Sequence, residues 1–174
     1  MEQTVTSFFH DFRQELLAGA ESNSRFQLAE FCAAVARELT ETGFVEDFEF
    51  CHYRAPRGMR VDGYWFDDEG TLALFVADFD CRAELENLTR TEVDAAFKRC
   101  SAFFEACLTK EFYRDLEVTS PEYGLARQIH DRRSMIRRVD FFLISERELS
   151  GKLQSLDSSE AAGIPANFHI WDMS

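Results

Sequence analysis

The feature that most constrains the fold is the run TLALFVADF at residues 71–79. Apolar side chains fill almost every position of this run, so a strand made from it has two apolar faces. A domain of two layers covers one face of its sheet and leaves the other in water. The run therefore predicts a central strand with helices packed on both sides of the sheet.

The residues before this run supply helices for one side and strands for its neighbours. Apolar residues recur at helical spacing in residues 8–17 and again in residues 28–39. Aromatic, alternating sequence at 48–54 and 61–66 predicts two strands. The turn Asp67–Gly70 then leads into the central run, so that residues 61–80 form a hairpin.

The residues after the run supply the second helical layer. Thr89 and Glu92 have the spacing of a capping box at the start of a long helix, and Ser120-Pro121 predicts the start of another. Residues 139–145 predict a buried strand, a short helix is expected after Ser145, and "FHIWD" predicts a last strand. The sequence therefore predicts a three-layer α/β sandwich with a mixed central sheet.

The domain organisation is predicted to be simple. The chain has 174 residues, enough for one ordinary domain, and it contains no repeat and no low-complexity linker. We therefore expect residues 1–174 to form a single domain. Because the sequence stops directly behind the last strand, we expect it to be the N-terminal part of a longer protein.

Carboxylates in the predicted hairpin are candidate metal ligands. Alternation along residues 61–66 places Val61, Gly63 and Trp65 on one face of the strand and Asp62 on the other. Asp78 ends the adjacent antiparallel strand, so Asp62 and Asp78 are expected to face each other across the hairpin. Carboxylate oxygens are the ligands that hard divalent cations such as Mg²⁺ and Mn²⁺ prefer. The alternative is that these acids bond nearby backbone or face water.

The charge of the chain limits its partners. The formal net charge is −13, and such a protein repels the phosphates of nucleic acid. One basic segment is the exception, and it is predicted to lie on the helix that begins at Ser120. Its members are Arg127, Arg132, Arg133, Arg137 and Arg138. This segment is interpreted as a solvated face paired with carboxylates, with a nucleic-acid or protein patch as the alternative.

Other signals concern the compartment. Five cysteines are scattered without metal-ligand spacing, which is typical of reduced, mostly buried thiols in a cytoplasm. No apolar run is long enough to span a membrane, and the first residues do not have the pattern of a secretory signal. A cytoplasmic protein without a membrane partner is therefore expected.

The predicted order of elements resembles the core of the restriction-endonuclease-like, or PD-(D/E)xK, superfamily, in which a helix, three strands, a helix and a strand follow one another. The resemblance implies that Asp62 is the aspartate of the second core strand and that Asp78-Phe79-Asp80 stands where the (E/D)-x-K tripeptide lies. It also implies Glu30 as a carboxylate from the preceding helix. In active members, these carboxylates bind one or two Mg²⁺ or Mn²⁺ ions.

The sequence departs from the active pattern at Asp80. A lysine at that position stabilises the charge that develops in phosphodiester cleavage, and an aspartate reverses its sign. Some members supply this lysine from the following helix, where Lys98 is the candidate. The resemblance therefore implies a nuclease scaffold in which catalysis has been lost, unless Lys98 reaches the site.

A narrower resemblance comes from short phrases spread along the chain. "SFFHDFRQELL", "RGMRVDGYWFDDEGTLALFVADF", "LTRTEV", "FFLIS" and "IWDM" are similar to the amino-terminal region of abortive-infection phage-resistance (AIPR) proteins. These proteins are bacterial, cytoplasmic and longer than this chain. The resemblance implies a role in anti-phage defence.

Three functions remain open on the sequence alone. The preferred hypothesis is a non-catalytic, nuclease-like domain that acts in interaction or assembly, with the rest of its parent protein or another protein as partner. The first alternative is a Mg²⁺- or Mn²⁺-dependent nuclease of DNA or RNA that uses Asp62 and Asp78. The second alternative is nucleic-acid binding without cleavage through the arginine segment. A homodimer is compatible with each of them.

Overall fold

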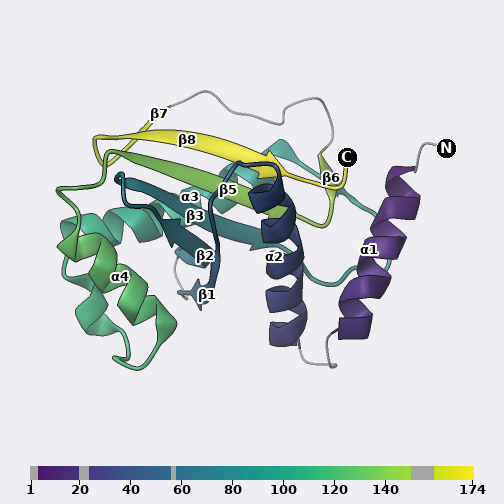
Figure 1. Ribbon diagram of the computed structural model, residues 1–174, viewed down its shortest axis with the longest axis horizontal. Coiled ribbons are helices and arrows are strands. Elements are labelled where there is room, and N and C mark those ends of the chain that lie inside the picture. Colours follow the sequence, from purple (N-terminus) through teal and green to yellow (C-terminus); the bar gives the residue numbers. More distant parts are fainter. Residues whose placement is uncertain (1–3, 20–23, 56–57, 150–158) are drawn as a thin grey trace.

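The computed structural model describes residues 4–19, 24–55, 58–149 and 159–174. Its centre is a six-stranded mixed sheet with the strand order β1-β2-β3-β5-β8-β7. Figure 1 shows α1 at the right of the view, α2 beside it near the middle, and α4 at the left. The predicted α/β sandwich with a mixed central sheet is confirmed.

The first half of the chain forms two helices and a three-stranded meander. The helices are α1 (Val5–Gly19) and α2 (Ser24–Glu41). The strands β1 (Glu49–Arg54), β2 (Arg60–Phe66) and β3 (Thr71–Asp78) are antiparallel neighbours. All five elements lie within a few residues of the segments that the sequence predicts.

The second half adds the other helical layer and completes the sheet. Its main elements are α3 (Arg90–Thr109), α4 (Pro121–Asp131), β5 (Arg138–Ser145) and β8 (Ile164–Trp171). The shorter elements are β4 (Asn87–Leu88), the 3₁₀ helix η1 (Phe112–Asp115), β6 (Glu148–Leu149) and β7 (Ser159–Ala161). β5 runs parallel to β3, and β8 runs parallel to β5.

Both long helices of this half start with the caps that the sequence predicts. The Thr89 side chain accepts the N–H of Glu92, and the Glu92 carboxylate accepts the N–H of Thr89, which is a complete capping box. Ser120 caps α4 by accepting the N–H of Tyr123, and Pro121 is the first helical residue. These caps fix where α3 and α4 begin relative to the sheet.

The sheet separates two hydrophobic cores, which explains why β3 is apolar on both faces. Leu72, Leu74 and Val76 of β3 pack with α3 and α4, whereas Phe75 and Ala77 pack with α1 and α2. All five side chains are buried. We call the two sides of the sheet the α3 face and the α2 face.

One prediction about β2 is wrong. Val61 packs in the core of the α3 face, together with Phe66, and not with Trp65 on the α2 face. The alternation breaks at Asp62, which is fully buried and accepts the N–H of Ala77 in β3, opposite the extra residue that β1 carries between Phe50 and Tyr53. The β2–β3 register stops at the pair Gly63–Phe75, so the start of β2 is free to turn differently.

Two predictions about the second half also need correction. Helix α4 ends at Asp131, so Arg127 alone of the five arginines lies within it. Arg132 is its C-cap and Arg138 begins β5. The short helix expected after Ser145 is absent from residues 146–149, where β6 forms instead, and the remainder of that prediction falls outside the described residues.

Candidate functional site

Asp62 is fully buried at the point where β2 and β3 part. Its Oδ1 lies 2.6 Å from Nδ1 of His52, its Oδ2 accepts Nε–H of Arg60 at 2.9 Å, and the same Oδ2 accepts the backbone N–H of Ala77 at 2.7 Å. The carboxylate thus takes a place in the ladder between the two strands. Both carboxylate oxygens have polar contacts with other residues of the protein, and these contacts stabilise the buried negative charge.

Asp78 lies at the end of β3 and is held by Arg147. Nε of Arg147 donates to Oδ2 of Asp78 at 2.8 Å, and Nη2 donates to Oδ1 at 3.0 Å. Ser145, fully buried at the end of β5, donates its hydroxyl to Oδ2 at 2.6 Å. This two-point contact between a guanidinium and a carboxylate is the strongest form of the pair. The hydrogen bonds to Asp78 raise the pKa of Arg147 above its ordinary value.

Arg147 also joins the site to the start of α3. Its Nη1 donates to Oε1 of Glu92 at 3.1 Å, so one guanidinium contacts two carboxylates. Glu92 is the residue that completes the capping box with Thr89, and its bond from the Thr89 N–H is the main cause that lowers its pKa. The site therefore depends on β3, on the end of β5 and on the first turn of α3 together.

A second buried carboxylate fixes the loop after β3. Glu146 accepts the backbone N–H groups of Asp80, Cys81 and Arg82, at 2.5, 3.1 and 2.6 Å. Cys81 has a φ of 53°, a left-handed conformation that lets three successive N–H groups point at one acceptor. Burial raises the pKa of Glu146, and the nearby Asp78 charge adds to that rise.

The α3 face of the site has a cavity of about 300 Å³. Its polar lining consists of Arg60, Asp78, Thr91, Glu92, Arg99 and Arg147. The remaining lining is apolar and comes from β3, β4, β5 and α3, for example Val76, Leu88 and Ala96. Three arginines and two carboxylates therefore line the cavity.

The structure brings together some of the predicted site residues and separates others. Asp62 and Asp78 lie on neighbouring strands, but each has its own set of partners. Asp80 is 76% exposed and pairs with Arg82 at 3.0 Å. Glu30 is exposed on α2, the helix of the opposite face. Lys98 is exposed on α3 and lines a different groove, with Asp94 and Glu160.

The arginine segment is spread over the end of α4, the following turn and the start of β5. Arg127 contacts the Tyr123 hydroxyl at 3.1 Å, and Arg132 lies over the ring of Phe66 at 5.2 Å. Arg133 donates to the carbonyl of His130, and Arg138 donates to Asp140 at 3.1 Å. Most of these guanidinium groups are thus engaged within the chain.

The chemistry open to this arrangement follows from the partners of the carboxylates. A divalent cation needs carboxylate lone pairs at about 2.0–2.6 Å. At Asp62 and Asp78 those lone pairs accept hydrogen bonds from Arg60, Ala77, Ser145 and Arg147. Within the described residues, no three His, Cys, Asp or Glu side chains are grouped so that they could hold a metal ion. The metal role of Asp62 and Asp78 stays a prediction.

Sequence reasoning missed the residues that hold the carboxylates. Arg60 had a local signal, because positions two apart in a strand share a face and Arg60 precedes Asp62 by two. His52 could have been found from the hairpin pairing of β1 with β2. Ser145 and Arg147 had no such signal, since they are 67 and 69 positions from Asp78.

Fold and site together define a class: a three-layer α/β domain whose central acidic pair is held by basic side chains of the same chain. A comparison with protein families is more specific. The model of the abortive infection phage resistance protein N-terminal domain matches residues 31–174, and the chain belongs to this family. The family indicates an anti-phage abortive-infection protein. The match leaves out α1 and the first turns of α2.

Two further findings complete the comparison. No curated protein and no solved structure matches the chain significantly. None of the helices in the described ranges combines the length and the apolar character needed to cross a lipid bilayer.

Proposed function

We propose that this domain is a nuclease-like, non-cleaving module of an anti-phage abortive-infection protein, and that it acts by binding a protein partner or the rest of its parent protein. The observation that carries the proposal is the two-point bond between Arg147 and Asp78. A guanidinium in this position supplies the positive charge that a metal ion would supply to the carboxylate. It cannot deprotonate a water molecule as a metal ion does.

The topology supports the nuclease-like part of the proposal. An antiparallel meander β1-β2-β3 is followed by α3 and by β5, which is parallel to β3. With α2 before it, this gives the order helix-strand-strand-strand-helix-strand, which the sequence resemblance to the restriction-endonuclease-like superfamily implies. Asp62 lies in β2 and Asp78 in β3, the strands to which the resemblance assigns the acids.

The position of the lost lysine supports the non-cleaving part. Asp80 stands there, mostly exposed and paired with Arg82. Lys98 lies in a groove that does not include Asp78. A cleaving enzyme would need both a metal ion and a cation near the scissile phosphate. In the described part of the chain, Arg147 is bonded to Asp78 and Arg82 is paired with Asp80.

The experiment is thermal unfolding with and without millimolar MgCl₂ or MnCl₂, together with incubation of the protein with DNA and RNA. We expect no rise in Tm and no cleavage. A metal at a hundred times its Kd would add roughly 2.7 kcal/mol to the free energy of unfolding, a shift of several degrees. Asp80→Asn is the matched control for Asp62→Asn and Asp78→Asn, because Asp80 is exposed.

The opposite result would establish the active alternative. A rise in Tm with Mn²⁺ that disappears in Asp62→Asn and Asp78→Asn, but persists in Asp80→Asn, would show a metal site at the two acids. Cleavage lost in the same two variants would show that the domain is a nuclease.

A further inference from the structure

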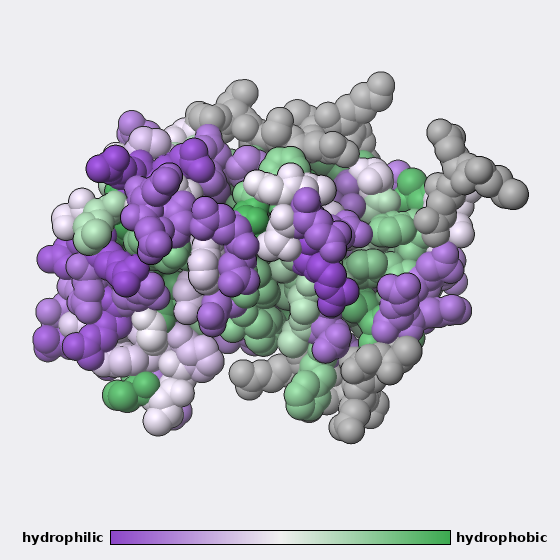
Figure 2. Space-filling model, in the orientation of Figure 1, coloured by the Kyte–Doolittle hydropathy of each residue, from purple (hydrophilic) through white to green (hydrophobic). Residues whose placement is uncertain are grey.

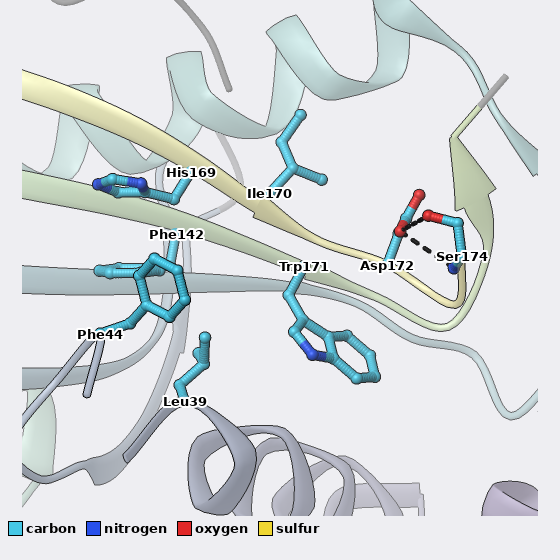
Figure 3. Close-up of a pocket in the computed structure, with 8 residues that line it drawn as sticks. All are labelled: Leu39, Phe44, Phe142, His169, Ile170, Trp171, Asp172 and Ser174. Atoms are coloured by element: carbon cyan, nitrogen blue, oxygen red, sulfur yellow. Dashed lines mark hydrogen bonds between the residues drawn. The ribbon is translucent and has the colours of Figure 1, made fainter. Parts of the chain in front are cut away.

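The α2 face of the sheet is only partly covered by its helices. A hollow of about 450 Å³ opens beside the last turn of α2, over β5 and β8, and Figure 3 shows the residues that line it. Half of its eight lining residues are aromatic: Phe44, Phe142, His169 and Trp171. We call this depression the aromatic hollow.

The wall of the aromatic hollow is a row of stacked rings. Phe75, Phe142 and His169 are direct neighbours on the parallel strands β3, β5 and β8. Their rings stack at centroid distances of 4.8 and 4.7 Å. Figure 3 shows the His169 ring above that of Phe142, while Ile170 points to the other side of β8. Strand pairing therefore fixes these rings in place before anything binds.

Phe44 is a rigid, exposed aromatic at the edge of the hollow. The end of α2 is a Schellman motif, in which the N–H of Phe44 bonds the carbonyl of Leu39 and the N–H of Gly43 bonds that of Thr40. Gly43 has the required φ of 81°. Phe44 and Leu39 both line the hollow, yet Phe44 remains 64% exposed. An exposed aromatic on a fixed backbone is typical of a binding anchor.

A second depression lies on the other side of the same turn, between α1 and α2. This acidic cleft has a volume of about 360 Å³. Its lining is Phe8, Asp11, Phe12, Glu15, Ala34, Arg37, Glu38 and Glu41. Trp171 connects the two depressions, because its indole N–H donates to Glu38 and its ring lies 6.0 Å from that of Phe12.

The charge of this face is strongly one-sided. With Asp172 from the hollow, five carboxylates and one arginine line the two depressions. Among the described residues, no lysine or arginine lies within ion-pair distance of Glu15, Glu38 or Glu41. Figure 2, which looks onto α1 and α2, shows apolar and hydrophilic surface next to each other here. This acidic face repels a second copy of itself, and it also repels the phosphates of nucleic acid.

From these observations we infer that the aromatic hollow and the acidic cleft form a docking surface for a basic, apolar segment of a partner protein. Apolar side chains of that segment enter the hollow beside Phe44 and Trp171. Its lysine or arginine side chains lie over the carboxylates of α1 and α2. The inference rests on the proposed function, because it names the kind of partner through which a non-cleaving module acts.

The test uses Trp171 as a reporter. The chain has two tryptophans, and Trp65→Phe removes the other one. The indole N–H of Trp65 is buried without a hydrogen-bond partner, so this change removes no bond. A synthetic amphipathic peptide of leucine and lysine is titrated into the protein, and the same peptide with glutamate for lysine is the comparator. We expect the lysine peptide to change Trp171 emission, and the glutamate peptide to leave it unchanged.

Variants separate this surface from general attraction by an acidic protein. Phe44→Ala is expected to weaken binding about tenfold or more, whereas Val118→Ala, at a residue 74% exposed elsewhere, is expected to have no effect. Glu15→Gln with Glu41→Gln should weaken binding and reduce its salt dependence. The matched control is Glu105→Gln with Glu117→Gln, two exposed glutamates away from the surface.

Equal binding of both peptides, or equal affinity of the Phe44→Ala and Val118→Ala variants, would overturn the inference. So would a concentration-dependent dimer that is lost in Phe44→Ala, since the occupant would then be a second copy. None of these variants touches Asp62 or Asp78. The peptide titration can therefore fail while the metal experiment succeeds, and the reverse.

Discussion

Arg147 lies on the loop after β5 and contacts two carboxylates, Asp78 at the end of β3 and Glu92 at the start of α3. Its side chain is 10% exposed, and that of Asp78 is 18% exposed. In such a setting, the removal of one partner leaves the other charged group without compensation. Arg147 therefore stabilises the fold at the same point where it occupies the lone pairs of Asp78.

Replacing Arg147 by methionine tests the energetic importance of this pair. We expect Arg147→Met to lower the free energy of unfolding by about 3 kcal/mol, because Asp78 stays partly buried and loses its two-point partner, keeping only the more distant Arg82 at 3.6 Å among the arginines of the described residues. The measurement is urea denaturation at neutral pH. Arg90→Met is the matched control: Arg90 pairs with Asp94 on the surface of α3, and we expect a loss below about 1 kcal/mol.

The double variant Arg147→Met with Asp78→Asn checks the cause. It should recover part of the lost stability, since the charge that lost its two-point partner is gone. Equal losses for Arg147→Met and Arg90→Met would show instead that the pair contributes no more than a surface ion pair.

The same residues show which contacts of the site can be predicted from the sequence and which cannot. Asp62 and Asp78 were predictable as neighbours, because a hairpin is local and its pleat fixes which residues face each other. Their partners were not. Ser145 and Arg147 reach Asp78 through the parallel pairing of β3 with β5, and a parallel register cannot be deduced from either strand alone.

At the scale of elements, β3 and the caps of α3 and α4 follow from local pattern, whereas the course of β2 does not. The extra residue in β1 and the carboxylate of Asp62 between β2 and β3 change which way Val61 points. Gly63 of β2 lies directly against the ring of Phe48, which packs on the α2 face. A Cβ on Gly63 would collide with the ring of Phe48 and would lie 3.0 Å from the carbonyl oxygen of Glu49.

A methyl group at Gly63 is therefore expected to be costly. We expect Gly63→Ala to lower the free energy of unfolding by about 1–3 kcal/mol, because the Phe48 ring and the β1 backbone must shift. Gly124→Ala in α4 is the matched control. A Cβ there has nothing within 4 Å, and we expect a gain of about 0.5–1 kcal/mol from the better helix propensity of alanine.

Chemical denaturation of both variants decides the question. In a chain that already carries Phe48→Ala, Gly63→Ala should lower the free energy of unfolding much less, since the Phe48 ring is the main obstacle. A neutral effect of Gly63→Ala on its own would mean that β1 moves aside easily, and the close packing at this point would then be unimportant.

For the whole molecule, the distribution of charge bears most directly on its partners. The net charge is −13, and the arginines that stood out in the sequence are spread over the end of α4, the following turn and the start of β5, with most of their guanidinium groups in contact with other residues of the chain. A nucleic-acid surface needs basic groups that are free to contact phosphates along one face. The acidic α2 face has the opposite character.

We therefore expect no measurable binding of duplex or single-stranded DNA at physiological salt. Fluorescence anisotropy of labelled oligonucleotides, at low and at physiological ionic strength, is the measurement. Arg132→Ala with Arg133→Ala should give the same result as the unchanged chain. Binding that falls steeply with salt and is lost in this double variant would instead identify the arginine segment as a nucleic-acid site.

The parallel pairing of β3 with β5 also has a kinetic consequence. The meander β1-β2-β3 is made of neighbouring segments, and it can form while the rest of the chain is still disordered. Ser145 reaches Asp78 only after 67 positions of chain have been brought back to the sheet, and ordering a long loop of this kind slows folding. We therefore expect Asp78 in a nascent chain to lack the partners Ser145 and Arg147 until β5 has been synthesised and docked.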